Sequence, residues 1–395
     1  MEKNLLILIL LLLAGLTDSL AQNTWTQKAD FGGTARFGAA GFSISGDGYL
    51  GTGSDGGSLY GDLWKYDTST NAWTQKIGTV TSWARVGFSI DSKAYIGTGY
   101  DGSYTNTFWE YNSATDTWTQ KADFGGTSRQ YAVGFSIGSK GYIGTGYDGL
   151  PNFTKDFWEY DPSTNVWTPK ANFGGAARCS AVGFSIGDKG YIGTGNDQNF
   201  YNDFWEYDPS INSWIRKADF GGSARQQAVG FVIGSKGYIG TGNDGNFKND
   251  FWEYDPSTNN WTQKANFRGA PRVFAGGFSI GGKGYIGTGW DLNVVYKDFW
   301  EYTPDSSVTS GTNIISKSNQ VLIFPNPASN KIFFTFTSSE KKEIQITNAL
   351  GEIVFSEKTD QEQMQIDVSN FSSGIYVMRW SSGENFETKT YSITK

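Results

Sequence analysis

The sequence contains no histidine and only one cysteine, Cys179, among its 395 residues. Without histidine the chain cannot build a Ser-His-Asp or Cys-His catalytic group, a His-ligated zinc or copper site, or a histidine acid or base. One cysteine cannot form an internal disulfide or a thiolate metal site. We therefore assign no catalytic residue, no metal and no cofactor, and we expect Cys179 to pack in the interior.

The chain also lacks an excess of basic residues, long apolar runs beyond its first 20 residues, and many prolines. Lys and Arg number 32 against 39 Asp and Glu, so the net charge is −7, which argues against nucleic-acid binding. Apolar residues make up 38%, aromatic residues 16%, and glycine reaches 52. This composition predicts an all-β protein of short strands and tight turns.

The first 21 residues have the pattern of a secretory signal peptide. Lys3 precedes an apolar run of 12 residues, Leu5 to Leu16, and Ser19-Leu20-Ala21 offers small residues for cleavage after Ala21. The run is short for a membrane span, although an N-terminal anchor helix is the alternative. We predict that residues 1–21 are removed, and we find no transmembrane segment elsewhere.

One unit recurs six times, every 45 to 49 residues. Its markers are Leu or Phe followed by Trp-x-Tyr, a second Trp nine residues later, Gly-Thr-Gly-x-Asp, and an Arg before a Gly-Phe strand. The tryptophans of the first marker are Trp64, Trp109, Trp158, Trp205, Trp252 and Trp300, and the second tryptophans are Trp73, Trp118, Trp167, Trp214 and Trp261.

Each copy is expected to form four strands, which in the fourth copy are residues 181–186, 189–193, 203–207 and 213–216. The third strand carries apolar side chains on both faces, so it needs a sheet on either side. A period near this length with four strands is typical of a β-propeller blade. We expect the small-residue first strand to be innermost and the Trp-bearing fourth strand outermost.

The sixth copy has no Trp-bearing fourth strand, whereas Trp25 lies in such a strand with no blade before it. Joining the two completes the sixth blade and closes the ring without an open sheet edge. The sequence thus predicts a six-bladed propeller closed by an N-terminal strand. The repeat resembles the kelch motif over residues 22–303, but has Gly-Thr-Gly where kelch repeats usually have a Gly-Gly pair.

Residues 304–319 are rich in Ser and Thr and are expected to form a linker. Residues 320–395 then predict a small β-sandwich. Its expected strands are residues 331–336, 343–348, 352–356, 364–368, 375–380 and 387–393.

This C-terminal segment resembles the type A sorting domain of the type IX (Por) secretion system of Bacteroidota. The matching residues are Pro325-Asn326-Pro327, Asn348-Ala349-Leu350-Gly351, Gly374-Ile375-Tyr376 and the terminal Lys395. The resemblance implies handling by the outer-membrane secretion machinery and a secreted or cell-surface location. An ordinary adhesive sandwich is the alternative.

Candidate ligand residues are expected where the copies differ. The loop between the second and third strands is the variable one, and it shares a face with the connection from the fourth strand to the next blade. Trp83, Tyr100, Tyr147 and Trp290 fall on this face. Aromatic side chains beside Asn and Asp suit sugar rings, and they suit a protein ligand equally well.

Six arginines begin the first strands near the axis. They are Arg36, Arg85, Arg129, Arg178, Arg225 and Arg272. They either pair with the nearby aspartates of Gly-Thr-Gly-x-Asp or line a pocket for an anionic ligand. Those aspartates are expected to cap their own turns, with calcium ligation as the alternative. In the second copy Arg85 precedes Phe88 by three residues, against six elsewhere.

The near-identity of the copies favours a binding protein, because an active site usually breaks such symmetry. We expect non-catalytic recognition of a glycan or protein ligand by an exported monomer. A surface carbohydrate-active enzyme, sialidase-like or sugar-epimerase-like, is the alternative, and a structural or adhesive surface protein is the third hypothesis. Copper oxidases of this fold type need histidine ligands and are excluded.

Overall fold

A computed structural model describes residues 23–149 and 152–305, and in the C-terminal part residues 322–324, 331–335, 342–348, 351–361, 363–382 and 385–393. The chain divides into two compact units, residues 1–308 and 309–395, which are described separately. The predicted signal peptide, most of the predicted linker and the Pro-Asn-Pro opening lie outside the described residues.

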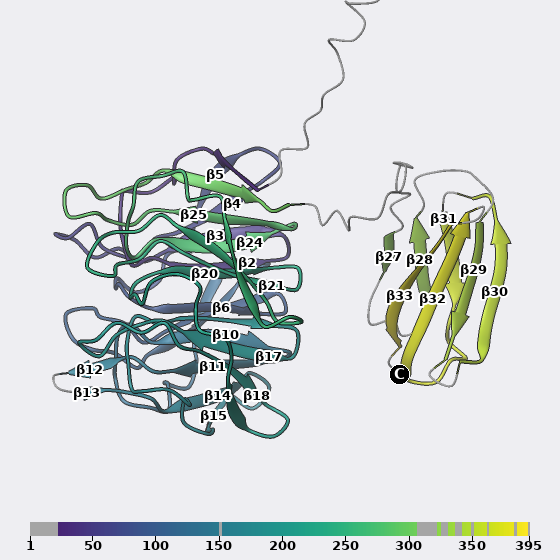
Figure 1. Cartoon of the computed structure of the whole chain (residues 1–395), viewed down its shortest axis with the longest axis horizontal. Coiled ribbons are helices and arrows are strands. Elements are labelled where there is room, and N and C mark those ends of the chain that lie inside the picture. The colour runs from purple at the N-terminus through teal and green to yellow at the C-terminus, as the bar shows by residue number, and fades with distance from the viewer. Residues whose placement is uncertain are drawn as a thin grey trace, which may run out of the picture. The chain divides into compact units, whose positions relative to one another are not determined.

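The first unit is a propeller of six four-stranded antiparallel sheets (Figure 1). Within each blade the strands follow chain order from the axis outward, except that the outermost strand of blade six is β1 (Thr24–Gln27). Blade one holds β2 (Ala40–Ile44), β3 (Asp47–Gly51), β4 (Leu63–Asp67) and β5 (Ala72–Lys76). Blade two holds β6 (Val86–Ile90), β7 (Lys93–Gly97), β8 (Phe108–Asn112) and β9 (Thr117–Gln120). Blade three holds β10 (Val133–Ile137), β11 (Lys140–Gly144), β14 (Phe157–Asp161) and β15 (Val166–Pro169).

The remaining blades repeat this order. Blade four holds β16 (Val182–Ile186), β17 (Lys189–Gly193), β18 (Phe204–Asp208) and β19 (Ser213–Arg216). Blade five holds β20 (Val229–Ile233), β21 (Lys236–Gly240), β22 (Phe251–Asp255) and β23 (Asn260–Lys264). Blade six holds β24 (Gly276–Ile280), β25 (Lys283–Gly287), β26 (Phe299–Thr303) and β1 (Thr24–Gln27). A short hairpin, β12 (Tyr147–Gly149) and β13 (Asn152–Phe153), extends the loop of blade three.

The ring closes as the sequence predicts. β1 pairs with β26 and places Trp25 opposite Tyr302. The Trp25 side chain is buried and lies in edge contact with Phe251 and Phe267 of blade five. A strand from one end of the propeller therefore completes the blade formed by the other end and supplies its outermost strand.

The first strands surround the axis, because each contacts the first strands of the two neighbouring blades. Their small residues are required by this crowding. A Cβ added at Gly183 of β16 would collide with the side chain of Val133 in the first strand of the preceding blade. Farther out, aromatic side chains fill the space between blades: the Phe204 ring lies 4.8 Å from Tyr254 and 5.0 Å from Trp261. Glycine inside and aromatics outside thus fit the widening gap between radial sheets.

The second unit contains two sheets, of order β27-β28-β31 and β30-β29-β32-β33. Their bounds are β27 (Leu322–Phe324), β28 (Lys331–Thr335), β29 (Lys342–Thr347), β30 (Ile353–Thr359), β31 (Gln363–Asp367), β32 (Gly374–Ser382) and β33 (Asn385–Ile393). Ile332 and Ile366 of one sheet share a buried core with Ile344, Met378 and Trp380 of the other. The six expected strands are present, with ends that differ by a few residues, and β27 is additional.

Candidate functional site

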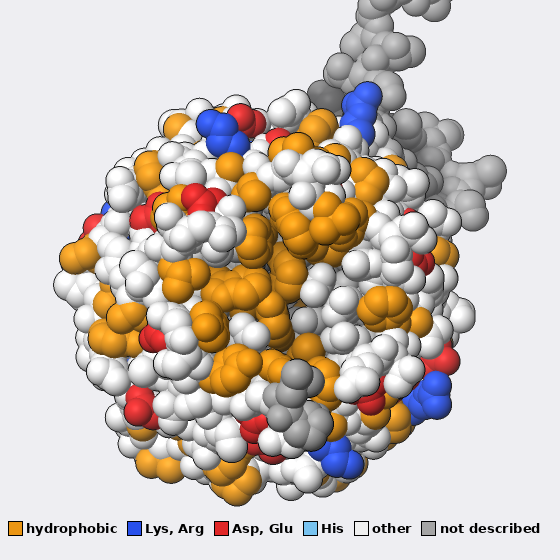
Figure 2. Space-filling model, turned by 90° about the vertical axis from the view of Figure 1, so that its left-hand side faces the viewer, with side chains coloured by type: hydrophobic (Ala, Val, Ile, Leu, Met, Phe, Trp, Pro, Cys, Tyr) orange, Lys and Arg blue, Asp and Glu red, His pale blue; other side chains and the backbone are white. Residues whose placement is uncertain are grey.

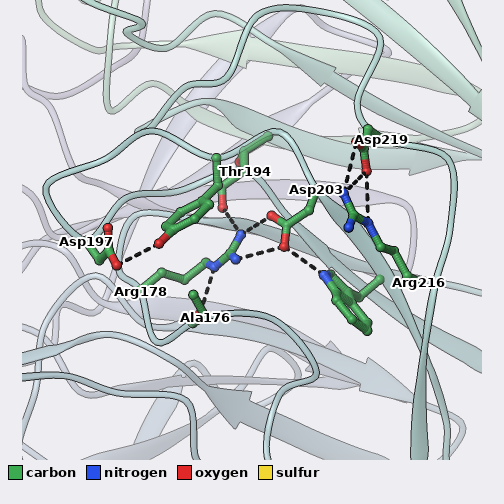
Figure 3. A network of polar contacts seen from close by, with 9 residues as sticks. Ala176, Arg178, Thr194, Asp197, Asp203, Arg216 and Asp219 are labelled. Atoms are coloured by element: carbon green, nitrogen blue, oxygen red, sulfur yellow. Dashed lines mark hydrogen bonds and ion pairs between the residues drawn. The ribbon is translucent and has the colours of Figure 1, made fainter.

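Five of the six blades, which we call the regular blades, contain a buried arginine that pairs with an aspartate at the start of the third strand. In blade four, Nη2 of Arg178 donates to Oδ2 of Asp203 at 2.9 Å, and Nη1 bonds the other carboxylate oxygen (Figure 3). Arg178 also donates to the carbonyls of Ala176 at 3.0 Å and Thr194 at 2.9 Å. The indole of Trp205 donates to the same Asp203 oxygen at 2.8 Å. One carboxylate therefore ties together two segments of the blade.

Five of the six predicted arginines take part in such pairs. The pairs are Arg36–Asp62, Arg129–Asp156, Arg178–Asp203, Arg225–Asp250 and Arg272–Asp298. Burial opposes ionisation of the Asp250 carboxyl, but hydrogen bonds from Arg225 and Trp252 outweigh burial and lower its pKa. These five guanidinium groups are buried and bonded within their own blades. We therefore do not retain Arg36, Arg129, Arg178, Arg225 and Arg272 as ligand residues.

Pairing of these arginines with the aspartates of Gly-Thr-Gly-x-Asp was one of their two predicted roles, and that pairing is wrong. The aspartates after Gly-Thr-Gly instead bond their own turns, which confirms the capping prediction at five of the six positions. The Oδ1 atoms of Asp55, Asp101, Asp197, Asp244 and Asp291 each accept a backbone N–H two residues later. Asp148 differs, because it accepts the Thr127 hydroxyl at 2.7 Å. The repeated third-strand glutamates are also structural: Glu206 accepts the Tyr191 hydroxyl at 2.6 Å.

Arg85 is not the counterpart of the other five arginines. Counted back from the Gly-Phe of its strand, it stands where the other blades have alanine, and Ser82 occupies the arginine position. Its side chain is 6% exposed, and its guanidinium bonds the hydroxyls of Ser82 and Thr107. Blade two is therefore the irregular blade of the ring.

The two sets of loops meet on one face, as the sequence predicts. In every blade a residue before the first strand forms a β-bridge with a residue after the second strand. The bridges are Phe37–Ser54, Trp83–Tyr100, Gln130–Tyr147, Cys179–Asn196, Gln226–Asn243 and Val273–Trp290. All four predicted aromatic residues thus lie on the same face, which we call the aromatic face.

Aromatic side chains gather around the axis on this face. Figure 2 shows hydrophobic side chains concentrated at its centre. The Phe37 ring lies 5.4 Å from Trp83 and 5.8 Å from Trp290, and Tyr131 stacks on Phe274 at 5.4 Å. The structure thus brings Trp83 and Trp290 together through Phe37.

Tyr100 and Tyr147 lie in a second group of rings farther along the face. Tyr104 connects them, with its ring 5.8 Å from Tyr100 and 5.7 Å from Tyr147. The Phe153 ring of β13 lies 5.4 Å from Tyr147. The four predicted residues therefore form two groups.

Sequence reasoning missed Phe37, Tyr131 and Phe274. They occupy the two positions that follow the repeated arginine, where the six copies carry different residue types. The variation of residue type among the copies is the signal that could have identified these two positions. The same signal identified the loop after the second strand.

A cavity of about 160 Å³ opens at the axial end of the central channel. Tyr131, Phe274, Ser180 and Gln227 are among its lining residues. Arg85 is the charged residue among the lining residues that the structure describes. The cavity therefore presents aromatic rings, a hydroxyl, an amide and one cationic residue. Burial raises the pKa of Tyr131, so its hydroxyl remains protonated.

The two central rings are held by a left-handed backbone. Tyr131 has φ of 56° and Phe274 has φ of 54°, at a position where blade one carries Gly38. For a bulky residue this conformation costs about 1–2 kcal/mol. The equivalent residue has a positive φ in all six blades, so the repeat itself imposes this conformation.

Cys179 lies beside this face and is buried, as predicted, at 7% exposure. Burial raises the pKa of its thiol to about 11 from an ordinary 9.0. At pH 8 the thiolate fraction is then about 100-fold lower than for an unperturbed thiol.

We therefore expect the native chain to react with a disulfide reagent at pH 8 at least about 100-fold more slowly than the same chain in denaturant. The reaction is followed by absorbance, and the denatured chain is the control. Equal rates in the two states would show that the thiol is accessible.

The described part of the chain contains no group of three or more Asp, Glu or Cys side chains arranged to hold a metal ion. Nor do the described residues include a helix with the length and apolar character of a membrane span.

Comparison with known proteins supports the two-part architecture. Residues 146–174 match the Kelch motif, and residues 322–394 match the Secretion system C-terminal sorting domain. The structure entitled "Structure of YjhT" aligns with a TM-score of 0.60 at 15% identity, covering 69% of this chain and 95% of that one. A likeness at that identity concerns the fold alone. Ulvan lyase NLR42 of Nonlabens ulvanivorans is 30% identical over 70 residues, which are 17% of this chain and 13% of that protein.

The chain is thus a kelch-type six-bladed β-propeller followed by a secretion sorting domain. The sorting domain indicates export by type IX secretion, either to the cell surface or into the medium.

Proposed function

We propose that the exported propeller is a binding protein that recognises a saccharide at its aromatic face without catalysis. The observation that carries this proposal is the cavity whose lining combines the stacked rings of Tyr131 and Phe274 with Ser180 and Gln227. Aromatic rings bind the apolar faces of sugar rings, while hydroxyl and amide groups bond sugar hydroxyls. Trp83 and Trp290 extend the apolar surface beyond the cavity through Phe37.

The surrounding domain scheme belongs to the same proposal. Residues 1–21 serve as signal peptide, residues 22–303 form the binding propeller, residues 304–319 are a linker, and residues 320–395 are read by the outer-membrane secretion machinery. The exported protein acts as a monomer. A protein ligand remains the alternative occupant of the aromatic face.

The composition of the cavity favours binding over hydrolysis. Glycoside hydrolysis uses a pair of carboxyl groups as acid and base or nucleophile. None of the described residues that line the cavity is Asp or Glu. A sialidase-like reaction would therefore need groups from outside this lining.

The proposal is tested by screening the full chain against a glycan array and soluble polysaccharides. Wild type is compared with a Trp83→Ala/Trp290→Ala variant, and Ile211→Ala/Ile215→Ala is the matched control. Ile211 and Ile215 are exposed apolar residues of blade four, 64% and 50% exposed, that lie in β19 and the turn before it. We expect wild type and control to bind the same saccharide and the tryptophan variant to lose it.

A folded wild type that retains no saccharide would contradict the proposal and direct the search to a protein ligand. Loss of binding in the isoleucine control as well would show that the effect does not arise at the aromatic face.

A further inference from the structure

Blade two lacks the carboxylate that every other blade places at the start of its third strand. Thr107 occupies the position of Asp62, Asp156, Asp203, Asp250 and Asp298. Thr107 accepts from Arg85 Nη2 at 3.3 Å and contacts the Thr105 hydroxyl at 3.0 Å. A hydroxyl thus stands where the other five blades have a negative charge.

This replacement leaves two buried donors without a hydrogen-bond partner among the described residues. They are Nη1 of Arg85 and Nε1 of Trp109. In the regular blades both kinds of donor bond the aspartate: Arg178 and Trp205 meet at Oδ2 of Asp203, at 2.9 and 2.8 Å. The unpartnered donors of blade two are thus a guanidinium and an indole. In the regular blades these two kinds of group donate to the carboxylate of an aspartate.

The arginine is cationic and its charge is poorly compensated. Burial lowers the pKa of Arg85 to about 10, opposed by the charge of Asp101, so the guanidinium stays protonated at neutral pH. The buried arginines of the other five blades each form an ion pair with an aspartate of their own blade, whereas Arg85, which enters from a different position in the chain, forms none among the described residues. An unpaired charge that is this deeply buried is costly, and a counter-ion relieves that cost.

The position lies close to solvent, because Thr107 is only half-buried. The aspartate side chains at the equivalent positions are 15% to 32% exposed, so this part of each blade reaches solvent. Threonine has one side-chain heavy atom fewer than aspartate and carries no charge. The replacement of aspartate by threonine therefore leaves space for less than a carboxylate group. Such a space favours a monatomic anion over a larger one.

We propose that Arg85, Trp109 and Thr107 form a binding site for a monatomic monovalent anion of the halide class. The anion takes the role of the missing aspartate: it accepts from the guanidinium and the indole and ties the third strand of blade two to the segment before its first strand. Arg85 also borders the cavity of the aromatic face, but the anion role is argued from the missing aspartate of blade two and does not depend on saccharide recognition.

The test measures the melting temperature of the full chain in sodium chloride and in sodium methanesulfonate at equal ionic strength. We expect chloride to raise the melting temperature of wild type in a saturable way. Thr107→Asp places a carboxylate where the anion is proposed to bind. In methanesulfonate this variant should therefore melt at a higher temperature than wild type, and the dependence of its melting temperature on chloride should be at least about tenfold weaker. Thr74→Asp, at an exposed position of β5 opposite Lys65, is the matched control and should behave as wild type.

Crystals of wild type grown in sodium bromide provide a second measurement that does not depend on the variant folding. We expect anomalous density between Arg85 and Trp109. Identical salt curves for wild type and Thr107→Asp would overturn the proposal, as would the absence of bromide from this position. Bromide density without halide-dependent melting would indicate an adventitious ion only and would also overturn it.

Discussion

Replacing the two central rings by glycine, Tyr131→Gly/Phe274→Gly, is expected to weaken saccharide binding by about 100-fold. Anchoring aromatic side chains commonly contribute 2 kcal/mol or more, and a loss of about 2.8 kcal/mol corresponds to 100-fold in affinity. Both residues line the cavity, and their rings stack on each other at 5.4 Å. The measurement is a calorimetric titration of the full chain with the saccharide retained in the screen.

Glycine is chosen because it separates binding from folding. Tyr131 and Phe274 have positive φ, and glycine adopts that conformation without the cost that other residues carry. Relief of strain offsets the lost ring contacts, so we expect the free energy of unfolding to change by less than about 1 kcal/mol. Ala84→Gly changes the same backbone position in blade two without removing a ring, and it should bind as wild type. Unchanged affinity in the double variant would exclude the two rings from the site.

Removing one carboxylate from the buried pairs is expected to have the largest effect on stability. We expect Asp203→Ala to lower the free energy of unfolding by about 3–5 kcal/mol, because it leaves a buried guanidinium without its partner. Arg178 is 0% exposed, and the Trp205 indole loses its acceptor as well.

Asp219→Ala is the matched control, since it breaks the neighbouring Arg216–Asp219 pair, which is visible in the same view (Figure 3). Those side chains are 57% and 43% exposed, and the expected change is about 0–1 kcal/mol. Urea unfolding followed by tryptophan fluorescence measures both variants. Equal losses would mean that burial does not decide the contribution of the pair.

The propeller could be predicted from the sequence because its markers recur at a fixed period. Trp25 lacked a blade and the sixth copy lacked a fourth strand, so closure followed from counting. The C-terminal strands alternate in a simple way and were found for the same reason. Both predictions depend on local patterns that repeat or alternate.

The contacts inside each blade were harder to predict. Arg178 reaches Asp203 across 25 residues, whereas the aspartate after Gly-Thr-Gly, Asp197, lies closer in sequence and bonds its own turn. Both aspartates recur, one in six copies and the other in five, and only the fold shows which of them pairs with the arginine. Arg85 was grouped with the other arginines because it recurs at nearly the same place, although alignment on Phe88 assigns that place to Ser82.

The centre of the aromatic face escaped prediction for the opposite reason. Phe37, Tyr131 and Phe274 come from three different blades and stand at positions where the residue type varies among the copies. Their proximity arises from the closure of the ring, since the axis brings together loops that are far apart in the chain. No local pattern carries that information.

The most direct test of saccharide recognition is a crystal structure of the full chain with the saccharide retained in the screen. The account predicts that a sugar ring lies at the mouth of the central channel, stacked on Tyr131 or Phe274, with its hydroxyl groups bonded to Ser180 or Gln227. A saccharide bound at the outer strands or on the opposite face of the propeller would contradict the account.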